Sequence, residues 1–205
     1  MFLPFLSRFG KKIVRLQAQG LYLRSPRKSD MLQWIELRRC SSDFLRPWEP
    51  KWPDGDLTPA GYYHRLRIYD RQASSGSGKT FFLFDKTAET LLGGISLTRI
   101  QQGRLPSATL GYWMGKPHAG KGYMSIALPA LLQHAFEDMK LDHVDAACLP
   151  HNLRSCGLLR KCGFDEMCRV SDYLEIDSKL EDHILLRCDS KRWRLNRLGV
   201  QKTLA

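Results

Sequence analysis

The stretch that decides the fold joins an expected strand to an expected helix, and it reads Gly115-Lys116-Pro117-His118-Ala119-Gly120-Lys121-Gly122. Residues 108–114 before it read as a strand, and residues 123–139 after it carry an apolar pattern wide enough for a buried helix. A turn in this position leaves main-chain N–H groups free at the start of the helix, where the helix dipole also favours negative charge. Gly120 and Gly122 would let phosphate oxygens approach the main chain, and the two lysines add positive charge. The stretch therefore predicts a phosphate-binding turn, with a tight strand-to-helix connection as the alternative.

The same stretch can be compared with the nucleotide-binding P-loop. Residues 115–121 fit the first seven positions of the pattern G-x-x-x-x-G-K, but the eighth position must supply a hydroxyl to magnesium and is Gly122 in this chain. The chain also lacks a convincing apolar strand that ends in a magnesium-binding aspartate. We therefore exclude an NTPase.

Outward from this turn, apolar patterns and turn residues predict an α/β domain. The expected strands are 21–24, 80–84, 91–100, 108–114, 144–149, 164–176 and 181–188, and the expected helices are 29–39, 58–73, 123–139 and 153–162. Their order predicts a mixed sheet with helices over it, in which the strands on either side of the 123–139 helix are parallel. Gly93-Gly94 predicts a bulge or a close backbone approach, and Pro129 lies inside an expected helix at a local cost.

Residues 44–53 form a segment of a different kind, because three prolines and two tryptophans interrupt any regular helix. Such a segment is a stiff loop with aromatic side chains. It either closes the end of a core or forms one wall of a substrate groove.

The length of 205 residues suits one domain with a sizeable core, and no run approaches the roughly 18 apolar residues of a membrane-spanning helix. The net charge of +11 lies at the chain ends. Residues 1–28 hold seven Lys or Arg and no acid, and residues 189–205 hold five against one acid. Basic ends on a neutral body favour weak contact with RNA or a lipid surface, and solvated tails explain them equally well.

These features divide the chain into a basic N-terminal arm (1–19), one domain (20–188) and a basic C-terminal tail (189–205). The arm has the amphipathic, acid-free character of an organelle transit peptide, but it is poor in serine and has no secretory cleavage site. We expect it to stay on the mature protein.

The cysteines form no Cys-x-x-Cys pair and no zinc spacing with the histidines, so we expect no metal. They are Cys40, Cys148, Cys156, Cys162, Cys168 and Cys188. Several lie in apolar contexts, as buried free thiols do, which favours a reducing, cytoplasmic location.

Four motifs occur in order along the chain: Gly111-Tyr112-Trp113-Met114, Ala119-Gly120-Lys121-Gly122-Tyr123-Met124, Pro150-His151-Asn152-Leu153-Arg154-Ser155 and Lys161-Cys162-Gly163-Phe164. Together they resemble the acetyl-CoA-binding core of the GNAT superfamily of N-acetyltransferases. Two further stretches, residues 44–50 and 172–177, resemble the ribosomal-protein alanine N-acetyltransferases of RimJ/RimL type. The resemblance covers about residues 20–188 and implies that coenzyme A lies between diverging parallel strands at 108–114 and 144–149. Pro117 departs from the family, which often has Gln or Arg there, so main-chain groups and Lys121 would carry the pyrophosphate contact.

The resemblance also implies site residues. The cofactor-binding set is Trp113, Met114, Ala119, Gly120, Lys121, Gly122, Tyr123, Met124, Asn152 and Ser155. In this family the main-chain N–H near Met114 would polarise the thioester, Asn152 would bind the pantetheine arm or a water, and the Ser155 hydroxyl would protonate the leaving thiolate. Asp172 would accept the amine proton, with Glu49 as second choice.

Trp48, Glu49 and Tyr173 are the candidate acceptor-binding residues. For several of the candidate site residues, a purely structural role remains an alternative. Asn152 and Ser155 straddle a helix start and could serve only as caps, and Asp172 could be an ordinary turn carboxylate. His118 and His151 read as exposed loop histidines rather than catalysts.

Three functions are therefore in competition. The first is acetylation of the α-amino group of a protein N-terminus, with a ribosomal protein as the expected acceptor. The second is acetylation of a small amine such as an antibiotic or polyamine, which would call for an acidic groove. The third is a ribosome- or RNA-binding assembly factor whose basic ends do the work and whose acetyl-CoA site is secondary.

Overall fold

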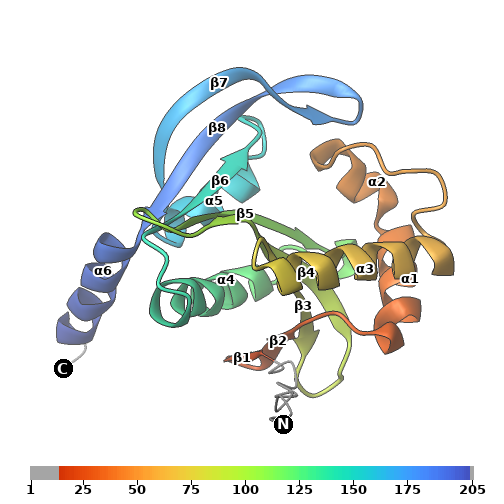
Figure 1. Cartoon of the computed structure of the whole chain (residues 1–205), viewed down its shortest axis with the longest axis horizontal. Helices are drawn as coiled ribbons and strands as arrows, with labels where there is room; N and C mark the ends of the chain where they lie inside the picture. The colour runs from red at the N-terminus through yellow and green to blue at the C-terminus, as the bar shows by residue number, and fades with distance from the viewer. Residues whose placement is uncertain (1–13, 204–205) are drawn as a thin grey trace, which may run out of the picture.

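The computed structural model describes residues 14–203, and its side chains through residue 196. A single eight-stranded sheet runs through the molecule in the order β1-β2-β3-β4-β5-β6-β8-β7 (Figure 1). The strands are β1 (Arg15–Ala18), β2 (Leu21–Arg24), β3 (Lys79–Asp85), β4 (Leu91–Gln101), β5 (Ser107–Met114), β6 (His143–Cys148), β7 (Asp165–Ile176) and β8 (Lys179–Asp189). The helices are α1 (Met31–Cys40), α2 (Ser42–Leu45), α3 (Pro59–Ser75), α4 (Tyr123–Gln133), α5 (Leu153–Lys161) and α6 (Ser190–Thr203).

One strand pair differs from all the others in the sheet. β5 and β6 are parallel and are connected through α4, as the sequence predicts, whereas every other neighbouring pair is antiparallel. The predicted mixed sheet is therefore confirmed. Parallel neighbours require a crossover, and α4 supplies it.

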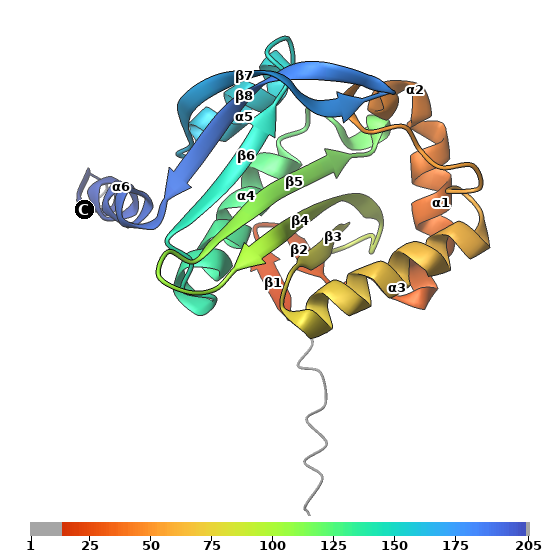
Figure 2. The same cartoon turned by 45° about the horizontal axis from the view of Figure 1, so that its top comes forward.

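Side chains alternate across the sheet and build a core on each face. In β3, Phe81 and Leu83 belong to the core under α4 and α5, while Phe82 and Phe84 belong to the core under α1 and α3. Figure 2 shows α4 behind the sheet, with α1 and α3 around its other side. Burial on both faces explains why β3 reads as a continuous apolar run, Phe81 to Phe84.

Both predicted irregularities are present. The β3–β4 register shifts between Leu83 and Phe84, beside Gly93. A Cβ at Gly93 would lie 2.4 Å from the main-chain oxygen of Trp113, so the close approach is real as well. Pro129 lies inside α4 and is exposed, and since it has no N–H it cannot bond the carbonyl of Ser125.

The ends of the chain hold more structure than the sequence indicates. β1 falls within the expected arm and pairs with β2, and α6 falls within the expected basic tail. Trp193 anchors α6, because it is buried and its ring centroid lies 5.3 Å from that of Phe136. Between residues 14 and 203, no helix is long and apolar enough to cross a membrane.

Candidate active site

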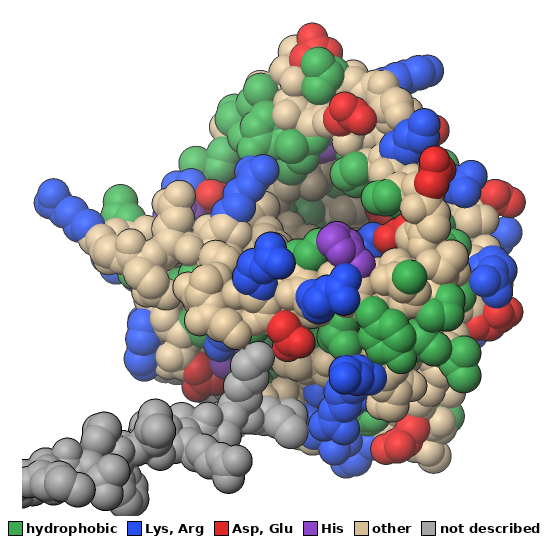
Figure 3. Space-filling view, turned by 45° about the vertical axis from the view of Figure 1, so that its right-hand side comes forward, with side chains coloured by type: hydrophobic (Ala, Val, Ile, Leu, Met, Phe, Trp, Pro, Cys, Tyr) green, Lys and Arg blue, Asp and Glu red, His purple; other side chains and the backbone are tan. Residues whose placement is uncertain are grey.

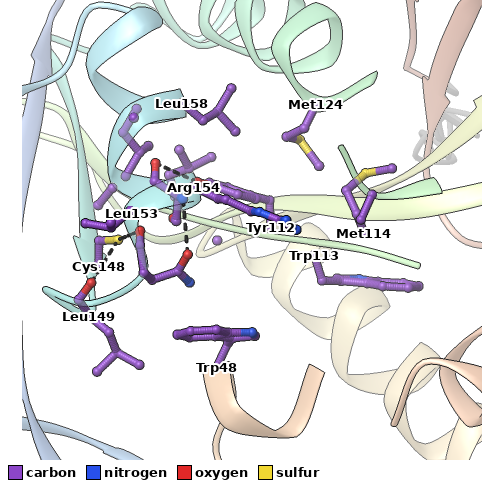
Figure 4. A pocket seen from close by; sticks show the side chains of 18 of the residues that line it. Trp48, Tyr112, Trp113, Met114, Met124, Cys148, Leu149, Leu153, Arg154 and Leu158 are labelled. Atoms are coloured by element: carbon purple, nitrogen blue, oxygen red, sulfur yellow. Dashed lines mark hydrogen bonds between the residues drawn. The ribbon is translucent and has the colours of Figure 1, made fainter. Parts of the chain in front are cut away.

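The main cavity opens where the two parallel strands part. β5 and β6 are paired from Ser107 and His143 to Leu110 and Ala146, and within the described structure β5 continues beyond this point along β4 alone. A cavity of about 1030 Å³ lies between the separated strands. This volume is at the upper end of the range for binding sites of organic ligands and cofactors. Its hollow appears in the space-filling view (Figure 3), and its lining appears in the close-up (Figure 4).

The glycine-rich turn forms one side of this cavity. Gly120 and Gly122 have positive φ angles of 77° and 80°, a conformation that is costly for residues with a Cβ. A Cβ at either position would meet nothing within 4 Å, so the turn leaves open space beside its main chain. Gly122 is also the N-cap of α4, whose first N–H groups lack partners inside the helix. The turn thus has the open, donor-rich geometry of an anion site.

Most of the predicted cofactor-binding residues line the cavity. In addition to the two glycines, they are Trp113, Met114, Ala119, Tyr123, Met124, Asn152 and Ser155. Lys121 is the exception, since it is exposed and lies outside the lining. His118 does line the cavity and is only partly exposed, and burial together with the Lys121 charge lowers its pKa.

A pair of hydroxyl groups lies between the two strands. Ser155 is in the first turn of α5, and its Oγ lies 2.7 Å from the Oη of Tyr112 on β5. Asn152 caps the same helix, because its Oδ1 accepts a hydrogen bond of 3.1 Å from the Ser155 N–H. Asn152 is therefore a helix cap, the alternative that the sequence left open, and its Nδ2 group is not used by the cap. Burial raises the pKa of Tyr112, and the hydrogen bond to Ser155 opposes that rise.

Two buried thiols stand beside this pair. Cys148 at the end of β6 lines the cavity, and its Sγ lies 2.9 Å from the Sγ of Cys156 on α5. Burial raises the pKa of Cys148 to about 12, so the thiol is protonated at neutral pH and is a poor nucleophile. The prediction of buried free thiols holds for these two and for Cys188, whereas Cys40 and Cys168 are exposed.

The aromatic loop at residues 44–53 forms the opposite wall. Trp48 lines the cavity, and its ring centroid lies 5.5 Å from that of His151. Glu49 accepts hydrogen bonds from Arg38 Nη1 (2.9 Å), Arg38 Nη2 (2.6 Å) and Trp52 Nε1 (2.7 Å). Both carboxylate oxygens of Glu49 are therefore occupied in bracing the loop against α1.

The β7–β8 hairpin approaches this loop from the other side. The main-chain N–H of Asp177, at the hairpin turn, donates a 3.1 Å hydrogen bond to the carbonyl of Glu49. The hairpin is irregular near Asp172, which has a φ of 49°. Asp172 is exposed and lies outside the cavity lining, and its main-chain N–H donates to the Asp182 carboxylate. Tyr173 also lies outside the lining, with its ring centroid 5.8 Å from that of His183, which is a lining residue.

Several lining residues were not predicted from the sequence. Tyr112 belongs to the motif Gly111-Tyr112-Trp113-Met114, and the alternation of side chains along a strand places it on the same face as Met114. The sequence therefore contained the information needed to predict that Tyr112 lines the cavity. Arg154 and Lys161 bring positive charge to the lining from α5. His183 comes from a strand whose position in the sheet no local pattern reveals. Among the described residues, no cluster of His, Cys, Asp and Glu is arranged to hold a metal ion.

Splayed parallel strands, a donor-rich turn at the start of α4 and a cavity between them define the GNAT class of acetyl-CoA-dependent N-acetyltransferases. The chain belongs to this family: residues 20–165 match the acetyltransferase (GNAT) domain.

Within the family, the chain is 30% identical to the [ribosomal protein uS5]-alanine N-acetyltransferase of Escherichia coli (strain K12), over 88% of this chain and 93% of that protein. It is 29% identical to the probable N-acetyltransferase YjcK of Bacillus subtilis (strain 168), over 83% of this chain and 94% of YjcK. The fold resembles the crystal structure of ribosomal-protein-S5-alanine acetyltransferase from Vibrio fischeri with a TM-score of 0.81 and 26% identity, covering 88% of this chain and 98% of that one. The fold also resembles the structure of Mycobacterium smegmatis RimJ in complex with CoA-disulfide, with a TM-score of 0.81 and 25% identity. That match covers 91% of this chain and 94% of the RimJ chain.

Proposed function

We propose that this enzyme transfers the acetyl group of acetyl-CoA to the N-terminal α-amino group of a ribosomal protein. The observation that carries the proposal is the 30% identity, along 93% of its length, to an enzyme named for acetylating ribosomal protein uS5. The cavity is consistent with it, because an anion-binding turn lies on one side and an aromatic wall with Trp48 on another. The donor would occupy the first region and the acceptor amine the second.

The charges of the lining argue against a polycationic small amine as the acceptor. Glu49 is the only lining carboxylate among the described residues, and its oxygens are already bonded to Arg38 and Trp52. Arg154 and Lys161 add positive charge to the lining. A polyamine would be repelled here, whereas a neutral α-amine on an extended peptide would not.

Acetyl transfer needs a neutral amine, stabilisation of the tetrahedral oxyanion and a proton for the leaving thiolate. We assign the pyrophosphate to residues 120–124 and polarisation of the thioester to the main-chain N–H near Met114, with Asn152 Nδ2 on the pantetheine arm. Ser155 protonates the thiolate. Asp172 accepts the amine proton through water, because its carboxylate lies outside the cavity lining.

The role of Ser155 has a direct test. Ser155→Ala is expected to lower kcat while the Kd of acetyl-CoA, measured by calorimetry, stays the same, because the substitution removes one hydroxyl and keeps the main-chain N–H bonded to Asn152. An unchanged kcat would remove Ser155 from the mechanism.

The acceptor is identified by incubating the enzyme with acetyl-CoA and a whole ribosomal-protein mixture and then reading N-terminal masses. We expect one N-terminus, starting with alanine, to gain an acetyl group. A matched reaction with spermidine and an aminoglycoside tests the competing class. Acetylation of a small amine without acetylation of any N-terminus would refute the proposal.

We also propose that the basic ends give the enzyme weak affinity for ribosomal RNA and that it acts in the cytoplasm, where its acceptor is made. Arg8, Lys11 and Lys12 of the N-terminal arm lie outside the described residues. Removing residues 1–13 should weaken co-sedimentation with ribosomes at low salt while activity on a short peptide is kept. Unchanged co-sedimentation would assign the arm to solubility alone.

A further inference from the structure

The hydroxyl pair of Tyr112 and Ser155 joins the two halves of the splayed sheet. Tyr112 lies on β5 beyond Leu110, the last residue of that strand paired with β6. Ser155 lies at the start of α5, which follows β6. The 2.7 Å contact between their oxygens is therefore a polar bridge between the two strands, and the lining around it includes the apolar Leu158 and the charged Arg154 (Figure 4).

The two hydroxyl groups have two possible arrangements of their hydrogens, because either oxygen can be the donor in the 2.7 Å contact. The Tyr112 hydroxyl has one hydrogen and two acceptors within reach, the Oγ of Ser155 at 2.7 Å and the carbonyl oxygen of Ser155 at 3.4 Å. The shorter contact is the better hydrogen bond. When Tyr112 donates to Oγ, the single hydrogen of Ser155 is left for another acceptor, and when Ser155 donates instead, Tyr112 bonds the Ser155 carbonyl. Transfer of the Ser155 proton to a sulfur requires the first arrangement.

Burial keeps this donor in place. It raises the pKa of Tyr112 more than the hydrogen bond to Ser155 lowers it, so the phenol is protonated at neutral pH. Tyr112 therefore keeps a hydroxyl hydrogen that it can donate to Ser155.

A serine that protonates a thiolate needs such a partner. A thiol has a pKa of about 8.5, and a serine hydroxyl is a weaker acid, so the transfer leaves a strongly basic oxygen that needs a hydrogen-bond donor. An unpaired charge there is costly, and a hydrogen bond to it is correspondingly strong.

We propose that Tyr112 is a positioning residue for the acetyl transfer, holding the Ser155 proton toward the leaving sulfur and stabilising Oγ as that proton departs. The inference rests on the role proposed for Ser155. The C–S bond breaks, its electron pair stays on sulfur, and the Ser155 proton passes to that sulfur. The proton removed from the amine returns to Ser155 through water.

The first test is a double-mutant cycle. Tyr112→Phe removes the hydroxyl and keeps the ring, and it is expected to lower kcat about 10- to 100-fold, the worth of one hydrogen bond to a charged group. The KM for acetyl-CoA should stay the same. In a Ser155→Ala background the same change should have no further effect, whereas additive losses would overturn the inference. Tyr63→Phe, at an exposed position on α3, is the matched control and should keep full activity.

The second test needs no acceptor. Ser155→Cys places a thiol at the same position, and the rate of its alkylation by iodoacetamide, read by mass spectrometry, reports how readily the thiolate forms. Adding Tyr112→Phe should slow that alkylation about 10-fold or more at pH 7, since the donor to the anion is gone. An unchanged rate would overturn the inference.

The two tests separate this inference from the proposed function. If no ribosomal N-terminus is acetylated, the acceptor assignment fails, and the cycle is run on whichever amine the enzyme does acetylate. The alkylation rate reports on the hydroxyl pair in either case.

Discussion

Replacement of Glu49 by Gln tests whether this carboxylate braces the acceptor wall or acts as a base. The wild-type side chain accepts three hydrogen bonds, two from Arg38 and one from Trp52. Gln keeps one acceptor oxygen and turns the other into an NH₂ group facing a donor. The Arg38 side chain is 5% exposed and loses its counter-charge. Because hydrogen bonds to charged groups contribute about 1.5–3 kcal/mol each and breaking a buried pair costs about 3–5 kcal/mol, we expect a loss of about 3 kcal/mol.

Urea unfolding measures this loss, and a calorimetric Tm should fall by about 6–12 °C for a chain of this size. Glu36→Gln is the matched control, because Glu36 pairs with Arg39 at 3.6 Å with both side chains more than 60% exposed, and it should change stability by less than about 0.5 kcal/mol. A Glu49→Gln enzyme that keeps wild-type stability but loses kcat by about 100-fold or more would refute the bracing argument and make Glu49 the base.

Two further predictions concern the glycine turn and the buried thiols. Gly120→Ala and Gly122→Ala should each weaken acetyl-CoA binding about 10-fold by calorimetry, because both positions have positive φ and open onto the cavity. Gly76→Ala, with a φ of 71° at the end of α3, should cost similar stability without changing that Kd, and an equal loss of binding there would contradict the argument. Burial raises the pKa of Cys148 and of Cys188 from 9.0 to about 12. Between about pH 9 and 12 the folded state keeps these two protons while the unfolded state loses them. The free energy of unfolding that the two thiols contribute is therefore fully present below about pH 9 and falls as the pH rises toward 12. Urea midpoints under reducing conditions should follow that decline, and Cys188→Ala should flatten it. An identical slope in the variant would contradict the assignment.

The sequence indicates most of the domain because its local signals are strong. The apolar run at residues 81–84, the Thr58-Pro59 helix start and the glycine turn each belong to one element and need no partner to be recognised. Thr58 caps α3 as expected, accepting a hydrogen bond from the Gly61 N–H. β1 and α6 were missed because β1 has only four residues and depends on pairing with β2, while α6 depends on Trp193 packing against Phe136.

In the site, too, the parts that depend on local sequence were easier to predict than the parts that depend on distant contacts. The cofactor side is built from one continuous stretch, and the glycines and Ser155 of that stretch line the cavity. The acceptor side depends on contacts between distant segments, and there the sequence-based expectations are weaker. Asp172 and Tyr173 lie outside the lining, and the carboxylate of Glu49 is occupied by Arg38, eleven positions earlier in the chain. No local pattern reports such a pairing.

Gly94 pairs with Trp113 across β4 and β5, and a Cβ on Gly94 would come within 2.5 Å of the indole Nε1. A side chain at position 94 would therefore occupy the space of the Trp113 indole, although Gly94 itself does not line the cavity. In related enzymes the two positions should covary, with a bulky residue at 113 only where 94 is glycine. A β4 substitution that tilts the indole would reshape the cavity wall, so the fit of the cofactor can change through a residue that never touches it.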